Sequence, residues 1–245
     1  MNAAGEIESL LREDGQLSAG PATLVPLGGG VSSEILKVTQ GTKTFVVKRA
    51  LAKLRVAADW RADVGRNAVE YAFYETMTEP LAGSVPRVYF HNPARGYFTM
   101  ECLEDGWQNW KELLLQGIIE PEHGALAGRL MGKLHASTWQ DARLREKFDT
   151  TENFRQLRSD PYLRTAATHR PAAASILLAE ASRLEDCHVC LVHGDFSPKN
   201  LLIKNNRMML LDAEVAWFGE PAFDVGFLMT HLFLKGLHHA PHPTA

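Results

Sequence analysis

The segment from Leu191 to Asp212 constrains the fold more than any other part of this chain. A polar loop, His193-Gly194-Asp195-Phe196-Ser197-Pro198-Lys199-Asn200, follows one β-prone run and precedes another, Leu201-Leu202-Ile203. A further apolar run, Met209-Leu210-Leu211, ends in Asp212. The pattern predicts short strands joined by tight turns, with an aspartate in the loop, an asparagine near the loop end and a second aspartate at a strand end.

These residue types suit phosphoryl transfer, a reaction that depends on an in-line hydroxyl and neutralised phosphates more than on covalent chemistry. Asp195 would accept the hydrogen bond of an attacking hydroxyl and take its proton late in the reaction. Asn200 and Asp212 would hold Mg²⁺ through hard oxygen ligands. His193 would brace the loop, and Phe196 would pack beneath it.

The first half of the chain predicts a small antiparallel sheet. Three β-prone runs, 24–27, 35–38 and 44–47, are separated by glycine-containing turns. In the first turn, the backbone of Gly28, Gly29, Gly30 and Ser32 could approach phosphate oxygens closely because no large side chains obstruct it. The alternative is an ordinary flexible hairpin, since the turn lacks the G-x-G-x-x-G spacing.

Lys48 ends the third run, after apolar residues that would desolvate its charge unless an anion lies nearby. Glu70 lies on a predicted helix over 64–77, on the same face as Phe73 and Met77, and is the expected partner. A Lys48–Glu70 pair would fix the lysine on nucleotide phosphates. One alternative is that Lys48 ends the strand in solvent. The other is that Glu75, and not Glu70, is its partner.

Two more strands are expected at 86–89 and 97–100, followed by a polar, turn-like segment from Glu101 to Gly106. We place a lobe boundary there, with residues 1–103 as a nucleotide-binding lobe and 104–245 as a catalytic lobe. The backbone of Glu101 to Leu103 would then bind the adenine edge. Helices are predicted at 107–116 and 122–137, whereas 141–171 is charged and irregular in pattern.

Composition excludes several function classes. The chain carries 26 basic and 29 acidic residues, so no global basic field exists to hold nucleic acid or an anionic membrane. No secretory signal pattern begins the chain, and the longest apolar stretch, 225–237, is too short to span a bilayer. We therefore expect a cytoplasmic protein without nucleic-acid or membrane partners. Cys187 and Cys190 form C-x-x-C, which is either a zinc or redox motif or two small apolar residues in a buried strand.

With its loop His193–Asn200, the chain resembles the aminoglycoside phosphotransferase and choline kinase family from about residue 24 to 235. The stretches 51–56 and 212–219 look closest to the 5-methylthioribose kinase branch. The resemblance implies an α+β, two-lobed protein-kinase-like fold, with an antiparallel sheet plus helix in the N-lobe and a mainly helical C-lobe. It also implies ATP and Mg²⁺ as cofactors and a sugar-like or amino-sugar-like hydroxyl acceptor.

The same likeness suggests that Glu214 assists Asp212 at the metal, with a solvated glutamate as the alternative. Lys199 departs from the family, which usually has a small residue there; it would stabilise the transferring phosphoryl group as a catalytic residue or lie exposed. Asp224 resembles a buried structural aspartate that supports the catalytic loop.

Two alternatives compete with a small-molecule kinase. One is a kinase-fold nucleotide-binding module with little or no transferase activity, against which Lys48, Asp195, Asn200 and Asp212 are all present. A protein kinase is disfavoured because no A-P-E segment follows Asp212. The run 225–237 is apolar around a whole helix, and only a short proline-broken tail follows. We therefore expect a C-terminally shortened form whose exposed helix drives self-association.

Overall fold

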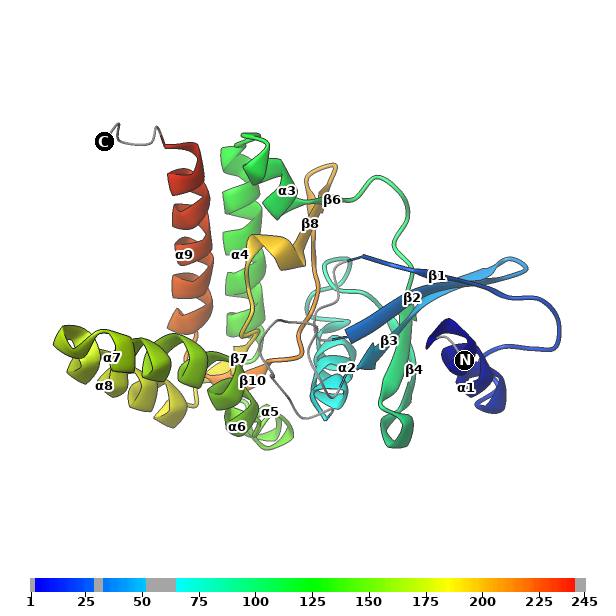
Figure 1. Ribbon diagram of the computed structural model, residues 1–245, viewed down its shortest axis with the longest axis horizontal. Helices are drawn as coiled ribbons and strands as arrows, with labels where there is room; N and C mark the ends of the chain where they lie inside the picture. Colours follow the sequence, from blue (N-terminus) through cyan, green and yellow to red (C-terminus); the bar gives the residue numbers. More distant parts are fainter. Residues whose placement is uncertain (1–2, 29–32, 52–64, 241–245) are drawn as a thin grey trace.

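A computed structural model describes residues 3–28, 33–51 and 65–240 of the chain. Its N-terminal part is a five-stranded antiparallel sheet in the order β1-β2-β3-β5-β4, with α1 (Ala3–Glu13) against it (Figure 1). The strands are β1 (Thr23–Pro26), β2 (Ser33–Gln40), β3 (Lys43–Ala50), β4 (Val88–Asn92) and β5 (Tyr97–Glu101). The short helix η1 (Pro93–Arg95) joins the last two strands.

Alternation along β3 decides which side chains meet the site. Phe45 and Val47 belong to a cluster with Ile7 and Leu11 of α1, on one face of the sheet. Val46 packs in the main core with α2 (Arg66–Met77), on the opposite face. Because side chains alternate along a strand, Lys48 is directed to the α2 face with Val46.

The C-terminal part is mainly helical. In Figure 1 α4 (Pro121–Ser137) and α9 (Ala222–His239) stand side by side, and His135 of α4 bonds to Asp224 of α9. The other helices are α3 (Trp110–Leu115), α5 (Ala142–Lys147), α6 (Thr151–Phe154), the π-helix η2 (Arg155–Arg164), α7 (Thr165–His169), η3 (Pro171–Ala173), α8 (Ala174–Asp186) and η4 (Pro198–Asn200).

Short strands carry the loop that was predicted to hold the chemistry. One ladder pairs β6 (Gln108–Asn109), β8 (Leu201–Lys204) and β9 (Arg207–Leu210), and another pairs β7 (Cys190–Val192) with β10 (Trp217–Gly219). The loop 193–200 therefore leaves β7 and enters β8, and β9 ends just before Asp212. No helix in the described part of the chain is long and apolar enough to cross a bilayer.

The structure corrects several local predictions. The segment 141–171, interpreted as irregular, is almost entirely helical, because its short helices gain stability by packing on one another and on α8. The helix expected from Trp107 begins at Trp110, since Gln108 and Asn109 pair with β8. The strand expected at 86–89 lies at 88–92. Only Cys190 lies in a buried strand, whereas Cys187 follows the end of α8.

Candidate active site

Lys48 is buried between two carboxylates from different parts of the chain. Its Nζ lies 2.7 Å from Glu70 Oε2 on α2 and 2.6 Å from Asp212 Oδ1 after β9. The predicted Lys48–Glu70 pair is therefore present, and Glu75 is exposed and pairs with Lys147 instead. The lysine joins the sheet, α2 and the C-terminal part at one point.

Tyr74 ties the same two acids together. Its hydroxyl donates to Glu70 Oε1 at 3.0 Å and accepts the backbone N–H of Asp212 at 2.7 Å. Asp212 needs this support because its φ is 66°, in the left-handed region that costs a residue with a side chain about 1 kcal/mol. Aspartate is among the few residues that adopt this backbone conformation with some frequency. Sequence reasoning did not find Tyr74.

Lys48 lies between the buried Glu70 and the partly exposed Asp212, and the pKa values of all three groups follow from this arrangement. Burial opposes the charge of Lys48, but Asp212 and Glu70 outweigh burial and raise its pKa, so the lysine stays protonated. Burial also disfavours the charged form of Asp212, yet Lys48 and Lys199 hold its pKa well below the ordinary range. Burial raises the pKa of Glu70 to about 7, against the attraction of Lys48. Of the two acids, Glu70 is thus the one that takes a proton more readily.

The loop from His193 to Asn200 is braced by buried hydrogen bonds. The ring of His193 accepts from the backbone N–H of Asp195 through Nδ1 and donates to the Leu211 carbonyl through Nε2. Burial lowers the pKa of His193, which suits this neutral form. Asp224 accepts the backbone N–H groups of His193 and Gly194. His193 and Asp224 therefore hold the loop in place, as expected.

Gly194 is required by the shape of this loop. Its φ is 77°, and a Cβ built there would lie 2.6 Å from the carbonyl oxygen of Val215. Any other residue at this position would have a strained backbone, and its Cβ would clash with the backbone of Val215. The glycine thus allows the Asp195 loop to approach the segment that follows Asp212.

Asp195 is held by two cations on one oxygen. Arg158 Nη2 lies 3.2 Å and Lys199 Nζ 2.8 Å from Asp195 Oδ2. Arg158 also donates from Nε to the carbonyl of Gly194 at 2.6 Å, so it grips the loop at two points. Within residues 3–28, 33–51 and 65–240, no donor is recorded on Oδ1, which leaves that oxygen for an incoming hydroxyl.

Arg158 was missed because it lies on the π-helix η2, in the segment that the sequence pattern left uninterpreted. The exposed fraction of Arg158 is only 9%, and an arginine is rarely buried unless its charge is paired, here with Asp195. No signal in a single sequence separates it from the many other arginines nearby. Lys199 differs from it in having about half of its side chain exposed.

The residues expected at the metal lie on two connected segments. Asn200 donates from Nδ2 to the Asp195 carbonyl, and its own carbonyl accepts the N–H of Leu211, the neighbour of Asp212. Its amide Oδ1 and the Asp212 carboxylate are oxygen donors of the kind that Mg²⁺ prefers. Glu214 is engaged differently, because Arg66 Nε lies 3.0 Å from its Oε2. The donor set thus fits Mg²⁺ through Asn200 and Asp212, with Glu214 held back by Arg66.

The remaining expected nucleotide-binding residues are only partly visible. Gly28 is an exposed turn residue, and Gly29, Gly30 and Ser32 lie outside the described residues. The backbone N–H of Glu101 is already bonded to the Arg87 carbonyl. For the N–H groups of Cys102 and Leu103, no backbone partner is recorded in the described ranges, so these two donors remain available to a ligand.

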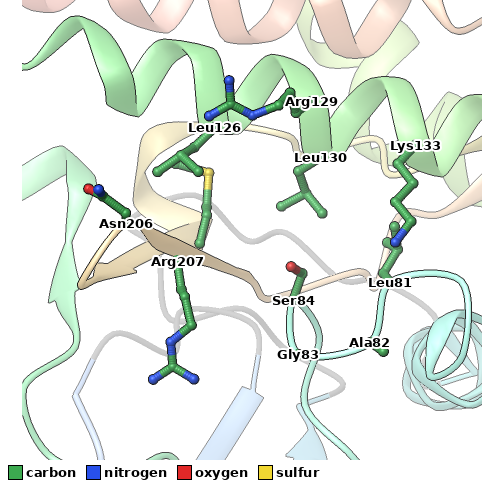
Figure 2. Close-up of a pocket in the computed structure, with 11 residues that line it drawn as sticks. Leu81, Ala82, Gly83, Ser84, Leu126, Arg129, Leu130, Lys133, Asn206 and Arg207 are labelled. Atoms are coloured by element: carbon green, nitrogen blue, oxygen red, sulfur yellow. The ribbon is translucent and has the colours of Figure 1, made fainter.

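A separate hollow lies on another side of the molecule. It is enclosed by the turn after α2, by α4 and by the β8–β9 hairpin, and Figure 2 shows Leu126 and Leu130 extending into it from α4. None of the candidate residues lines this hollow. The Ser84 carbonyl beside it accepts the N–H of Leu210, which anchors the turn to β9. We do not assign the chemistry to this cavity.

In sequence, the chain is similar to methylthioribose kinases. The chain is 25% identical over 268 residues to a methylthioribose kinase of Cronobacter sakazakii, covering 95% of this chain and 65% of the relative. A methylthioribose kinase of Exiguobacterium sibiricum is 23% identical, with 91% of this chain and 64% of the relative covered. The chain thus spans slightly less than two thirds of the length of these relatives.

Solved structures share the fold at low identity. An aminoglycoside phosphotransferase in complex with streptomycin and ATP superposes with a TM-score of 0.56 at 18% identity, covering 99% of this chain and 85% of that one. A choline/ethanolamine kinase family protein from Mesorhizobium loti gives 0.56 at 20% identity, covering 96% and 72%. The fold is therefore the two-lobed, kinase-like α+β fold that was expected. A model of the phosphotransferase enzyme family matches residues 23–240, and the chain belongs to that family.

Proposed function

We propose that this chain binds ATP and Mg²⁺ and transfers the γ-phosphoryl group to a hydroxyl of a small molecule. The observation that carries the proposal is the direct linkage of four groups. Lys48 contacts Asp212, Asp212 follows the residue bonded to Asn200, and Asn200 bonds to the backbone of Asp195. This linkage would hold phosphate-binding, metal-binding and hydroxyl-binding groups in fixed relation, as positioning catalysis requires.

In the proposed reaction, the acceptor hydroxyl approaches Oδ1 of Asp195 and is aligned by a hydrogen bond. A bond forms between the hydroxyl oxygen and the γ-phosphorus, and the bond from that phosphorus to the β–γ bridging oxygen breaks, releasing ADP. The hydroxyl proton passes to the Asp195 carboxylate. Lys199, 2.8 Å from Asp195, would stabilise the negative oxygens of the moving phosphoryl group.

The nucleotide would lie between a lobe of residues 1–103 and a catalytic lobe of residues 104–245. Lys48, positioned by Glu70, would bind phosphate oxygens, and Asn200 with Asp212 would hold Mg²⁺, which neutralises phosphate charge. The glycine turn 28–32 would cover the phosphates, and the backbone from Glu101 to Leu103 would meet the adenine. Glu214 would assist Asp212 at the metal once it is released from its ion pair with Arg66.

A direct assay tests the proposal. The purified chain is incubated with Mg·ATP and a panel of hydroxyl compounds, including methylthioribose, simple sugars, amino sugars and choline. ADP release is measured together with the mass of any phosphorylated product. Asp195→Asn supplies the inactive reference, and Asp149→Asn, an exposed aspartate outside the site, is the matched control. A module without transferase activity would bind Mg·ATP and phosphorylate none of the compounds.

We also propose that the protein works in the cytoplasm and can self-associate. A cytoplasmic kinase would have ATP at hand, and the three cysteines, which are free, suit a reducing compartment. The exposed apolar side chains of α9, Val225, Met229, Phe233, Leu234 and Leu237, form the surface for self-association. Light scattering tests this, because Phe233→Glu should shift an associating chain toward monomer.

A further inference from the structure

Side chains of two helical elements lie beside Asp195. The π-helix η2 supplies Arg158 and Tyr162, and α9 supplies Phe227, His231 and Lys235. The rings form a row, with centroids 5.9 Å apart for Tyr162 and Phe227 and 4.8 Å apart for Phe227 and His231. This row leads from the catalytic loop toward α3, which contacts α9.

The row borders the reacting carboxylate. The guanidinium of Arg158 bonds to Asp195 and also lies over the ring of Phe227, at 5.4 Å from its centroid. The charges of Asp195, Lys199 and Arg158 all act on His231. A compound that presents a hydroxyl to Oδ1 of Asp195 would therefore rest against these rings.

The charges on this surface are predominantly positive. Lys235 Nζ lies 3.4 Å from His231 Nδ1, and the charge of Lys111 on α3 acts on Lys235. Neither lysine makes an ion pair with any carboxylate in the described ranges. Burial, with Lys235 next in effect, lowers the pKa of His231, so this ring counts as a neutral hydrogen-bonding group at neutral pH.

The acids of the same elements do not pair with these cations: Glu112, next to Lys111 on α3, is exposed, and no ion pair joins it to either lysine among the described residues. Asp195 is shared by Arg158 and Lys199. Asp160 on η2 pairs with Arg155 and Arg164, and Glu185 on α8 pairs with Arg164. Among the described residues, no carboxylate is recorded as acting on Lys235. Unpaired lysines beside a half-buried histidine favour an anionic group from a ligand.

We infer that the acceptor is a hydroxylated anion, a sugar or polyol that carries a carboxylate or phosphate group. Its negative group lies toward Lys235 and Lys111, its carbon skeleton rests on Phe227 and Tyr162, and its hydroxyl reaches Asp195. This inference rests on the proposed phosphotransferase function and narrows its acceptor class. A polycationic amino sugar or a quaternary amine would instead bring like charge against Lys235.

Matched compounds test the charge preference. Gluconate, glucose and glucosamine share a six-carbon polyol skeleton, and ribose 5-phosphate with ribose forms a second pair that distinguishes phosphate from carboxylate. Binding is measured by calorimetry on the full chain with and without saturating Mg·AMP-PNP, and turnover by ADP release with product mass. At least one anion should bind about tenfold more tightly than its neutral parent, and glucosamine more weakly than glucose.

Variants locate the preference on the surface. Lys235→Glu should raise the KM or Kd of the favoured anion about tenfold and change that of its neutral parent much less. Lys133→Glu, the same change at an exposed position on α4, is the matched control and should behave as wild type. If the charge reversal prevents folding, Lys235→Gln should move the anion's affinity in the same direction.

The outcomes separate this inference from the proposed function. Anions that bind no better than their neutral parents, no measurable binding of any compound, or an equal loss for anion and neutral parent in Lys235→Glu would each overturn the inference. Failure of Mg·AMP-PNP to bind would overturn the proposed function instead, and the binding of gluconate without nucleotide would still report on the charge of the surface. Phosphorylation of neutral acceptors in preference to anions would sink the inference and leave the kinase function standing.

Discussion

The hydroxyl of Tyr74 lies 2.7 Å from the backbone nitrogen of Asp212 and accepts its N–H. The same hydroxyl donates to Glu70, so a single side chain on α2 fixes both the partner of Lys48 and the left-handed backbone of Asp212. Burial and the two nearby acids raise the pKa of Tyr74 far above its ordinary value, so the hydroxyl remains a donor throughout the working range of pH. Tyr74 thereby couples α2 to the segment that follows β9.

Tyr74→Phe should lower the free energy of unfolding by about 1–2 kcal/mol, because it leaves the Asp212 N–H without its partner and removes one of the two donors to Glu70 Oε1, the other being Lys48. It should also weaken Mg·ATP binding, since Asp212 is no longer held in its left-handed conformation. Denaturant titration and calorimetry measure the two effects. Tyr71→Phe on the same helix is the control, because its hydroxyl reaches only the exposed Glu75.

Glu70 should make the stability of the ligand-free protein fall as pH rises. Burial raises its pKa from the ordinary 4.5 to about 7 in the folded state, so the native protein keeps a proton that the unfolded chain releases. The stabilisation is fully present below about pH 4.5 and is lost as pH rises through 7. Relative to Glu70→Gln, the wild type should lose about 1–3 kcal/mol across this window. Parallel stability curves for the two proteins would contradict the raised pKa.

Asp195→Asn should reduce kcat by about 10²–10⁴-fold, because the amide cannot take the hydroxyl proton. Nucleotide affinity should remain near that of the wild type, since Asp195 contacts Arg158 and Lys199 and not Lys48. Turnover and Mg·ATP titration are compared with those of Asp149→Asn. Wild-type turnover in Asp195→Asn would remove Asp195 from the chemistry.

Asp212→Asn should weaken Mg·ATP binding by about 10- to 100-fold, the scale expected for a well-placed group at a metal site. It should affect metal-free ATP much less, because the lost charge also frees Lys48 from one of its two carboxylates. Titrations with and without Mg²⁺ measure the difference. Equal losses under both conditions would mean that Asp212 does not act through the metal.

Arg158 should act as a positioning residue for Asp195. Arg158→Gln removes the ion pair with Asp195 and weakens the hold on the Gly194 carbonyl, so kcat should fall by about tenfold or more. The KM for ATP should change little, and Arg158→Lys should recover part of the loss because it restores charge without the planar fork. A purely structural role would lower stability and change kcat and the KM for ATP together.

The local sequence pattern was enough to predict the strands of the N-terminal sheet and the helix that packs on it. The strands at 23–26, 33–40 and 43–50 follow from β-prone runs between turns, and the helix bearing Glu70 follows from the spacing of Phe73 and Met77. For the segment 141–171, the local pattern did not predict the helices that the structure has. These helices are short, and their stability comes from packing on α8 and β7, which a local pattern does not record.

The sequence alone determined the residue types at the site and their order, because Asp195, Asn200 and Asp212 lie within one loop–hairpin unit whose spacing is fixed by the chain. It also indicated Lys48 and Glu70, since a lysine and a glutamate on apolar faces require partners. Tertiary structure alone decided that Tyr74 bridges Glu70 and Asp212, that Arg66 engages Glu214, and that Arg158 grips Asp195. These pairs are separated by tens of residues, with the sole exception of Tyr74 and Glu70 on one helix. Only the packing of α2 and η2 against the loop brings such groups within hydrogen-bonding distance.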